Sequence, residues 1–287
     1  MSHHIVEVHD LAHTYADGTR AVNGISFRIH HGESVAVVGA NGAGKSTLLL
    51  HLNGYLTPQE GTVRIGDFYL TKETVREIRK TVGMIFQDPD DQLFMPTVYD
   101  DVAFGPMNLG LSPEQVEKRV HDALARTDVA HLRDRPPYKL SGGEKRAVAI
   151  ATVLAMNPEI LVMDEPSSSL DPRARRTLIE LLAGFRHTKI IATHDLDMVL
   201  DLCERTIIIK NGRITADGPT LKLFQDVELL AESHLEKPFR LQACPVCSGQ
   251  KFPEKPSQVD DHSHGHDQDH VHHDESMDGR SLLIKNK

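Results

Sequence analysis

Hydrophobic residues along this chain follow two patterns, short unbroken runs and longer stretches with helical spacing. Unbroken runs such as SVAVVGA at 34–40, EILVMDE at 159–165 and TKIIATH at 188–194 are typical of strands buried on both faces of a sheet. Residues 62–68 and 82–87 resemble further strands of this kind. Because such strands alternate with helices, the pattern predicts a mostly parallel α/β sheet.

Helical spacing begins at Lys45 and dominates from about residue 97 to residue 156. The clearest helix is SPEQVEKRVHDALART at 112–127, with a serine cap, a proline at the first helical position and a glutamine at the third. Another helix is expected at 172–185. After it, RTIIIKNGRITADG predicts a hairpin that turns at Asn211–Gly212, because the Asn-Gly pair tolerates positive φ.

Composition divides the chain into a folded domain at 1–235, with a helical subdomain at about 88–156, and an extension at 236–287. After Pro238 the sequence is rich in Pro, Gly, Ser, Asp and His, and packing signals stop, so we expect a disordered Cys/His/Asp-rich tail. The formal charge is -9, and residues 257–278 carry seven acids and no Lys or Arg. The remainder is therefore close to neutral, and the absence of Trp and of a basic stripe argues against a nucleic-acid partner.

Any membrane role is expected to come through a partner. No apolar run approaches the roughly 18 residues that a membrane span needs. The first ten residues, MSHHIVEVHD, lack the charged and apolar regions of a signal peptide. Three cysteines do not make a disulfide framework, so the sequence indicates a cytosolic protein.

A glycine-rich loop, GANGAGKST, lies between the predicted strand at 34–40 and the helix from Lys45. It matches the phosphate-loop pattern G-x-x-x-x-G-K-[ST], in which backbone N–H groups and a helix N-terminus surround a phosphate. Lys45 would reach the β- and γ-phosphates of ATP, and the Ser46 hydroxyl would bind Mg²⁺. The alternative is a glycine-rich turn without a ligand. The predicted ATP-binding residues here are Gly39, Asn41, Gly42, Gly44, Lys45, Ser46 and Thr47.

Two carboxylates end the predicted strand at 159–165. Asp164 suits the Mg²⁺ shell, and Glu165 is placed to orient or activate the attacking water. Many strands end in an acid, so this pair gains its meaning from the phosphate loop.

Three further stretches narrow the class of nucleotide hydrolase. LSGGEKR at 140–146, SSLD at 168–171 and ATHD at 192–195 follow the phosphate loop in an order that resembles the ATP-binding cassette family, over about residues 4–235. The resemblance implies a P-loop NTPase fold with a RecA-like parallel-sheet core, an N-terminal antiparallel β subdomain and an inserted helical subdomain. It also implies ATP hydrolysis coupled to transport.

The resemblance assigns roles to residues outside the loop. Ser141, Gly142 and Gly143 would contact ATP held by a facing subunit, which requires a dimer of like chains or of paralogues. Asp171 matches the aspartate that makes a dimer contact in the family, and it is counted among the ATP-binding residues.

Three single residues complete the implied site. Tyr15 would stack on adenine, although it would otherwise be a core tyrosine. Gln87 would contact Mg²⁺ and take part in catalysis, and His194 would be the catalytic switch at the γ-phosphate; a lone histidine after a strand is otherwise structural.

The segment FQDPDDQLFMPTVYDDVAFGP at 86–106 resembles the energy-coupling-factor importers, which take up vitamins or cobalt and nickel ions. The implied partners are integral-membrane subunits, namely a coupling component and a metal-binding component, so the chain would lie peripherally on the cytoplasmic face of the cell membrane. We expect an acidic and aromatic groove for a partner helix, or else an ordinary surface of the helical subdomain. The groove residues would be Asp90, Asp91, Gln92, Phe94 and Phe104.

The tail indicates the cargo. Its imidazoles, neutral near pH 7 and interleaved with carboxylates, suit Ni²⁺, Co²⁺ or Zn²⁺, although a solvated tail with no task is the plain alternative. We therefore predict import of nickel or cobalt. A vitamin importer, and a cassette ATPase outside transport that acts in translation or DNA repair, remain the alternatives. The candidate ligands are Cys244, Cys247, His262, His264, His266, His270, His272 and His273.

Overall fold

The computed structural model describes residues 4–242 of the 287-residue chain. The chain divides into two units, Met1–Gln242 and Ala243–Lys287, and the described residues belong to the first. The predicted extension at 236–287 lies almost wholly outside the described residues, as do all eight candidate tail ligands. The predicted domain boundary and the tail metal site therefore stay predictions.

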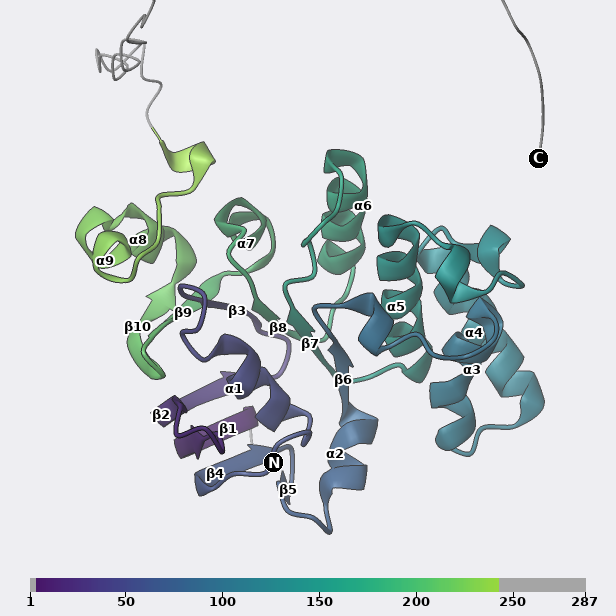
Figure 1. Ribbon diagram of the computed structural model, residues 1–287, viewed down its shortest axis with the longest axis horizontal. Helices are drawn as coiled ribbons and strands as arrows, with labels where there is room; N and C mark the ends of the chain where they lie inside the picture. Colours follow the sequence, from purple (N-terminus) through teal and green to yellow (C-terminus); the bar gives the residue numbers. More distant parts are fainter. Residues whose placement is uncertain (1–3, 243–287) are drawn as a thin grey trace, which may run out of the picture. The chain divides into compact units, whose positions relative to one another are not determined.

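Two sheets organise the described residues (Figure 1). A four-stranded antiparallel sheet has the order β2-β1-β4-β5, and a six-stranded sheet has the order β10-β9-β3-β8-β7-β6, in which only β10 runs antiparallel to its neighbour. The strands are β1 (His4–Thr14), β2 (Arg20–His30), β3 (Ser34–Val38), β4 (Glu60–Ile65), β5 (Phe68–Tyr69), β6 (Val82–Ile85), β7 (Ile160–Asp164), β8 (Thr188–Ala192), β9 (Arg205–Lys210) and β10 (Arg213–Pro219).

Helices cover both faces of the larger sheet, and α3, α4 and α5 form a separate group beyond β6 in Figure 1. These helices lie within residues 88–156, for which a helical subdomain is predicted. The helices are α1 (Lys45–Leu52), α2 (Val75–Thr81), α3 (Val98–Asn108), α4 (Pro113–Arg126), α5 (Gly142–Met156), α6 (Pro172–Ala183), α7 (Leu196–Leu202), α8 (Thr220–Gln225) and α9 (Val227–Glu232), with short 3-10 turns that include η1 (Pro89–Asp91) and η4 (Phe239–Leu241).

The unbroken apolar runs fill two cores, one on each face of the larger sheet. In β3, Val35 and Val37 pack with α1 and the antiparallel sheet, whereas Ala36 and Val38 pack with α3 to α9. Successive side chains of a strand point to opposite faces, so a strand between two cores needs apolar residues at every position. The predicted α/β class with an antiparallel N-terminal sheet is confirmed.

Two elements form where local sequence signals predict them, helix α4 and the hairpin of β9 and β10. Ser112 accepts a hydrogen bond from the N–H of Gln115 while the Gln115 side chain accepts one from the N–H of Ser112, so α4 begins with a capping box. The hairpin of β9 and β10 turns at Asn211 and Gly212, both with positive φ. Among the helices of residues 4–242, none is long and apolar enough to cross a membrane.

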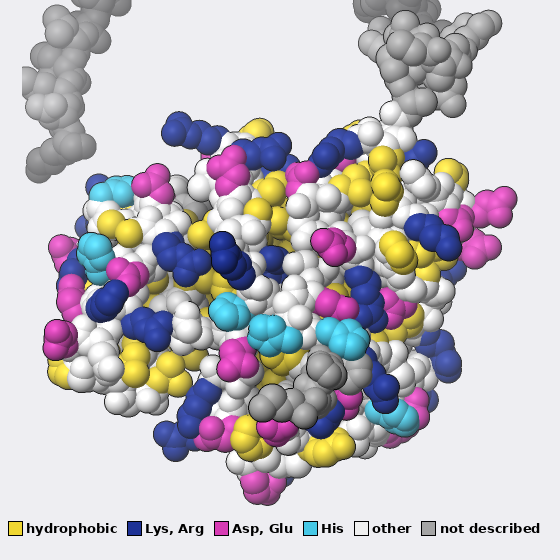
Figure 2. All heavy atoms as spheres, turned by 180° about the vertical axis from the view of Figure 1, so that it is seen from behind, with side chains coloured by type: hydrophobic (Ala, Val, Ile, Leu, Met, Phe, Trp, Pro, Cys, Tyr) yellow, Lys and Arg dark blue, Asp and Glu magenta, His cyan; other side chains and the backbone are white. Residues whose placement is uncertain are grey.

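Charge is evenly mixed on one face of the molecule. On the side opposite to the view of Figure 1, Lys and Arg side chains lie interspersed with Asp and Glu, and hydrophobic side chains form small separate patches (Figure 2). No field of a single sign covers this face, in keeping with the near-neutral charge of the chain outside residues 257–278.

Candidate functional site

The predicted phosphate loop and carboxylates meet at one edge of the larger sheet. The loop follows β3, Gln87 follows β6, Asp164 and Glu165 end β7, and His194 follows β8. Because these strands are parallel, their carboxyl ends lie at the same edge, where open α/β sheets bind ligands. Topology alone therefore gathers side chains that are more than a hundred residues apart in sequence.

A cavity of about 770 Å³ lies at this edge. It is lined by twelve of the predicted residues, and by six that were not predicted: Thr19, Ala21, Ala40, Ala43, His234 and Leu235. The predicted residues that line it are Tyr15, Gly39, Asn41, Gly42, Gly44, Lys45, Ser46, Thr47, Gln87, Asp164, Glu165 and His194. A volume of this size suits a nucleotide-sized ligand.

Close backbone packing requires two of the loop glycines. A Cβ on Gly39 would stand 2.2 Å from the carbonyl oxygen of Ile209, and one on Gly44 would stand 2.1 Å from that of Ala21. Gly44 also has a φ of 105°, a conformation that L side chains rarely adopt. The loop is therefore held against β9 and β2 with no room for side chains at these points.

Lys45 is buried at the first position of α1, and its Nζ donates to the carbonyl oxygens of Gly39 (2.8 Å) and Ala40 (3.1 Å). Both acceptors belong to the loop that it follows. The ammonium is therefore already folded over the loop, beside the open N-terminus of α1, where anions are favoured.

Asp164 is buried, and its Oδ1 has no hydrogen-bond partner among the described residues. Burial raises the pKa of its carboxyl, as does the neighbouring Glu165 carboxylate, whereas the Ser46 hydroxyl and Lys45 lower it. An unpaired buried carboxylate oxygen beside a serine hydroxyl is a fitting place for a hard cation. Ser46 and Asp164 therefore fit Mg²⁺, which prefers oxygen ligands.

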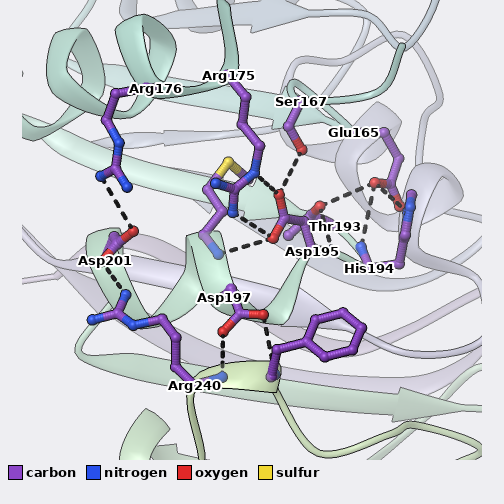
Figure 3. A network of polar contacts seen from close by, with 12 residues as sticks. Glu165, Ser167, Arg175, Arg176, Thr193, His194, Asp195, Asp197, Asp201 and Arg240 are labelled. Atoms are coloured by element: carbon purple, nitrogen blue, oxygen red, sulfur yellow. Dashed lines mark hydrogen bonds and ion pairs between the residues drawn. The ribbon is translucent and has the colours of Figure 1, made fainter. Parts of the chain in front are cut away.

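Glu165 has a φ of 46° and its side chain is held by three donors (Figure 3). Its Oε2 accepts from the Thr193 hydroxyl at 3.0 Å and the His194 backbone N–H at 3.3 Å, and it lies 2.8 Å from Nδ1 of His194. Sequence reasoning named Glu165 and His194 but missed Thr193, which no motif distinguishes from an ordinary strand residue. Thr193 and His194 together fix the Glu165 carboxylate at the cavity wall.

Tyr15 lies at the other end of the loop. Its hydroxyl is 3.0 Å from the Thr47 hydroxyl, its ring meets the ring of His13 edge to face, and its side chain is 39% exposed. Tyr15 thus lines the cavity with a partly exposed side chain, and stacking on adenine stays a prediction.

Residues predicted to contact the ATP of a facing subunit line a second cavity of about 520 Å³, namely Ser141, Gly143 and Asp171. Gly142 is exposed. Ser141 caps α5 by accepting from the Glu144 N–H, and Asp171 caps α6 by accepting from the N–H groups of Arg173 and Ala174. A single chain therefore does not bring these residues to the phosphate loop.

Arg146 connects α5 to Phe86 and Gln87, a link that the sequence did not reveal. Its guanidinium is buried and donates to the carbonyl oxygens of Phe86 (2.7 Å) and Gln87. Movement of α5 would therefore pull directly on the segment that carries Gln87 to the cavity.

The expected partner surface is only partly as predicted. Phe94 and Phe104 are 64% and 43% exposed and pack edge to face with ring centroids 5.1 Å apart. Asp90 and Asp91 are exposed, and Asp90 pairs with Lys145 at 2.6 Å.

Gln92 is the exception on that surface. Its amide nitrogen donates to the Ala149 carbonyl and the Thr152 hydroxyl, each at 2.7 Å, and its oxygen accepts from the Phe86 N–H. Its polar groups are thus engaged inside the subdomain, so Gln92 supports the surface from beneath.

Comparison with known proteins identifies the family. Residues 22–168, just over half of the chain, match the family profile described as ABC transporter. A Geobacter sulfurreducens protein provisionally named as an ABC transporter ATP-binding protein (GSU1281) is 68% identical over 247 residues, which cover 86% of this chain and 99% of the relative. The chain is an ABC transporter ATPase. ATP hydrolysis coupled to transport is its activity, and the predicted family and P-loop NTPase fold are confirmed.

Two further comparisons connect this ABC ATPase to particular transporters. The energy-coupling factor transporter ATP-binding protein EcfA of Methanothermobacter thermautotrophicus is 46% identical over 239 residues, 82% of this chain and 77% of the relative. The solved structure of cbiO1 from Clostridium perfringens, described as part of the ABC transporter complex cbiONQ, superposes with a TM-score of 0.71 at 39% identity, covering 80% of this chain and 94% of that one.

Transition-metal ligation is a separate matter from ATP chemistry. Within residues 4–242, no group of three or more His, Cys, Asp or Glu side chains could hold a metal ion. The tail histidines and the Cys244–Cys247 pair lie outside the described residues, so the prediction of nickel, cobalt or zinc binding there is untested.

Proposed function

We propose that this ABC ATPase powers an energy-coupling-factor importer that carries nickel or cobalt ions into the cell. The observation that carries the ATPase part is the single cavity that unites the phosphate loop, the unpaired Asp164 oxygen and the triply held Glu165. In this proposal, Mg²⁺ held by Ser46, Asp164 and Gln87 would neutralise developing charge on the phosphates.

The residues of this chain would divide the remaining work. Lys45 and the loop N–H groups hold the phosphates, and Tyr15 holds the base. Glu165 orients and deprotonates the attacking water, and the Thr193 and His194 donors fix that carboxylate in place. His194, on the same wall, reaches the terminal phosphate.

A dimer follows from the separation of the two cavities. The phosphate loop lines one cavity, and Ser141, Gly143 and Asp171 line the other. If both contact one nucleotide, as the family resemblance implies, the second set must come from a facing subunit. Two chains related by a two-fold axis would make both sites alike.

Coupling to the membrane would use the exposed pair Phe94 and Phe104. Large exposed aromatics that contact each other on a helical subdomain are typical of an interaction surface, and the neighbouring acids suit a basic partner helix. The Arg146 link to Gln87 would carry the partner's movement to the cavity. The chain would thus be held peripherally on the cytoplasmic face of the membrane by integral-membrane subunits.

The tail supports a transition metal as the cargo. A tail with six histidines in twelve residues suits such an ion, and it has no evident use in vitamin import. Vitamins remain the alternative cargo, because the energy-coupling-factor importers that residues 86–106 resemble take up vitamins or cobalt and nickel ions.

Two experiments test these proposals. Phe104→Ala should reduce recovery of integral-membrane proteins with the tagged chain, whereas Phe68→Ala should not; both phenylalanines are 43% exposed, but Phe68 lies on β5 of the antiparallel sheet. Cells lacking the gene should accumulate less nickel or cobalt, and the wild-type gene should restore accumulation. Unchanged metal content together with impaired vitamin uptake would replace the proposed cargo with the alternative.

A further inference from the structure

Two residues of the nucleotide cavity come from the C-terminal end of the described chain. His234 and Leu235 line it together with the phosphate loop, although neither belongs to a motif. The side chain of His234 is exposed, whereas the preceding Ser233 is 1% exposed. The imidazole is thus exposed next to a buried residue and is accessible to a ligand in the cavity.

His234 occupies a backbone position that glycine ordinarily takes. The N–H of Leu235 donates to the Leu230 carbonyl at 2.8 Å, and the N–H of His234 donates to the Ala231 carbonyl at 3.1 Å, so α9 ends in a Schellman turn. That turn places the residue after the cap in the left-handed region, and His234 has a φ of 55°. A side chain there is strained, so a histidine beside a ligand cavity points to a use for its imidazole.

The end of α9 is tied to the strand that supports the phosphate loop. The Nζ of Lys210, the last residue of β9, donates to the carbonyl oxygen of Glu232. One residue earlier, the Ile209 carbonyl touches Gly39 so closely that a Cβ there would stand 2.2 Å away. His234 thus follows a segment anchored to the strand that packs against the phosphate loop, and it lines the same cavity as that loop.

The chain after His234 is fixed as well. The Asp197 carboxylate on α7 accepts from the backbone N–H groups of Phe239 and Arg240, each at 3.1 Å, and Arg240 pairs with Asp201 (Figure 3). Helix α7 begins two residues after His194. With one anchor on β9 and another on α7, the His234 position is preorganised, which lowers the entropy lost when a ligand is bound.

We propose that the imidazole of His234 donates an N–H hydrogen bond to a phosphate oxygen of the nucleotide bound in this cavity. An imidazole carries at least one N–H donor in either charge state. This inference rests on the proposed ATP site. It adds His234, which belongs neither to the phosphate loop nor to the pair of carboxylates, to the residues that contact the nucleotide.

Equilibrium binding of ATP with Mg²⁺ to the full-length chain tests the proposal. His234→Gly removes the imidazole and also relieves the left-handed strain, so the melting temperature should be unchanged or higher while ATP binds about tenfold more weakly. Asn157→Gly is the matched control. Asn157 has the same φ of 55° at the end of α5, and it lies before β7, at the opposite edge of the sheet from the cavity.

The outcomes separate the inference from the site on which it rests. Unchanged ATP affinity in His234→Gly would overturn the inference, as would a lowered melting temperature or an equal loss of affinity in Asn157→Gly. Lys45→Ala should abolish ATP binding. If Lys45→Ala bound ATP like the wild type, the proposed nucleotide site itself would fail, whatever His234→Gly showed.

Discussion

Replacing Glu165 by Gln removes the proposed catalytic base and changes little else. Oε2 of Glu165 accepts from the Thr193 hydroxyl at 3.0 Å and the His194 N–H at 3.3 Å, and the oxygen of a glutamine amide can accept both bonds. The main structural loss is the contact of the carboxylate with Nδ1 of His194 at 2.8 Å, about 1 kcal/mol of folding free energy. The variant should therefore fold and bind ATP.

The catalytic loss should be far larger than the structural one. A positioned general base contributes about 10²- to 10⁴-fold to the rate, or about 3–5 kcal/mol of activation free energy. We expect phosphate release by the purified full-length protein at saturating ATP to fall at least about 100-fold, with ATP affinity retained. The assay compares turnover and equilibrium ATP binding in the same preparations.

Glu117→Gln provides the matched control for that experiment. Glu117 also accepts from donor groups, here the Arg133 guanidinium at 2.7 and 2.9 Å, but it lies on α4 and does not line the cavity. Its variant should keep wild-type turnover, because an ion pair in contact with solvent contributes little to stability. Near-normal turnover in Glu165→Gln would refute the assignment of Glu165 as the base.

Three further experiments probe the loop, a buried histidine and the tail. In a denaturant titration, Gly44→Ala should lower the free energy of unfolding by about 2–5 kcal/mol, because the new side chain is strained in the left-handed region and clashes with Ala21. Gly42→Ala should lower it by only about 1–2 kcal/mol, because Gly42 has a φ of 77° but nothing lies within 4 Å of the added Cβ. Burial lowers the pKa of His51 below its ordinary 6.5. The unfolded chain therefore takes up a proton first as the pH falls below 6.5, and the free energy of unfolding decreases there. His51→Asn should flatten this pH dependence, and an identical slope of unfolding free energy against pH in the variant would contradict the assignment. Deleting residues 257–287 should leave ATP turnover within about twofold but lower nickel and cobalt binding measured by equilibrium dialysis; loss of turnover would place the tail within the fold.

The chemistry that sequence could predict is the chemistry that local spacing encodes. The phosphate loop needs a strand, glycines at set positions and a helix, and all three are consecutive in 34–52. Asp164 and Glu165 likewise follow directly from a strand of apolar residues that the sheet buries on both faces. Such features form wherever the segment folds, so the order of the amino acids alone reveals them.

Contacts between distant segments could not be predicted in this way. Arg146 reaches the carbonyls of Phe86 and Gln87 across 60 and 59 positions, and Thr193 reaches Glu165 across 28, each through backbone or side-chain groups that no motif marks. Strand β2 was also missed, although buried Ile25, Phe27 and Ile29 alternate with exposed residues in the local pattern of a half-buried strand.

The sequence also could not predict which residues of the expected partner surface are exposed. Sequence placed Gln92 in the groove with its neighbours, because all five residues share one polar and aromatic stretch. The structure turns Gln92 inward to the Ala149 carbonyl and leaves Phe94 exposed two positions later. The direction of each side chain depends on the packing of α3 and α5, which a single stretch of sequence does not encode.

ATP-driven metal uptake by the purified transporter would test the proposed function most directly. The tagged chain and the membrane proteins that accompany it are reconstituted into proteoliposomes, and cobalt and nickel transport is followed with ATP present on the side of the ATPase. We predict ATP-dependent transport of one or both ions by the wild type and none by Glu165→Gln. Transport of a vitamin with no transport of either metal would contradict the proposed cargo.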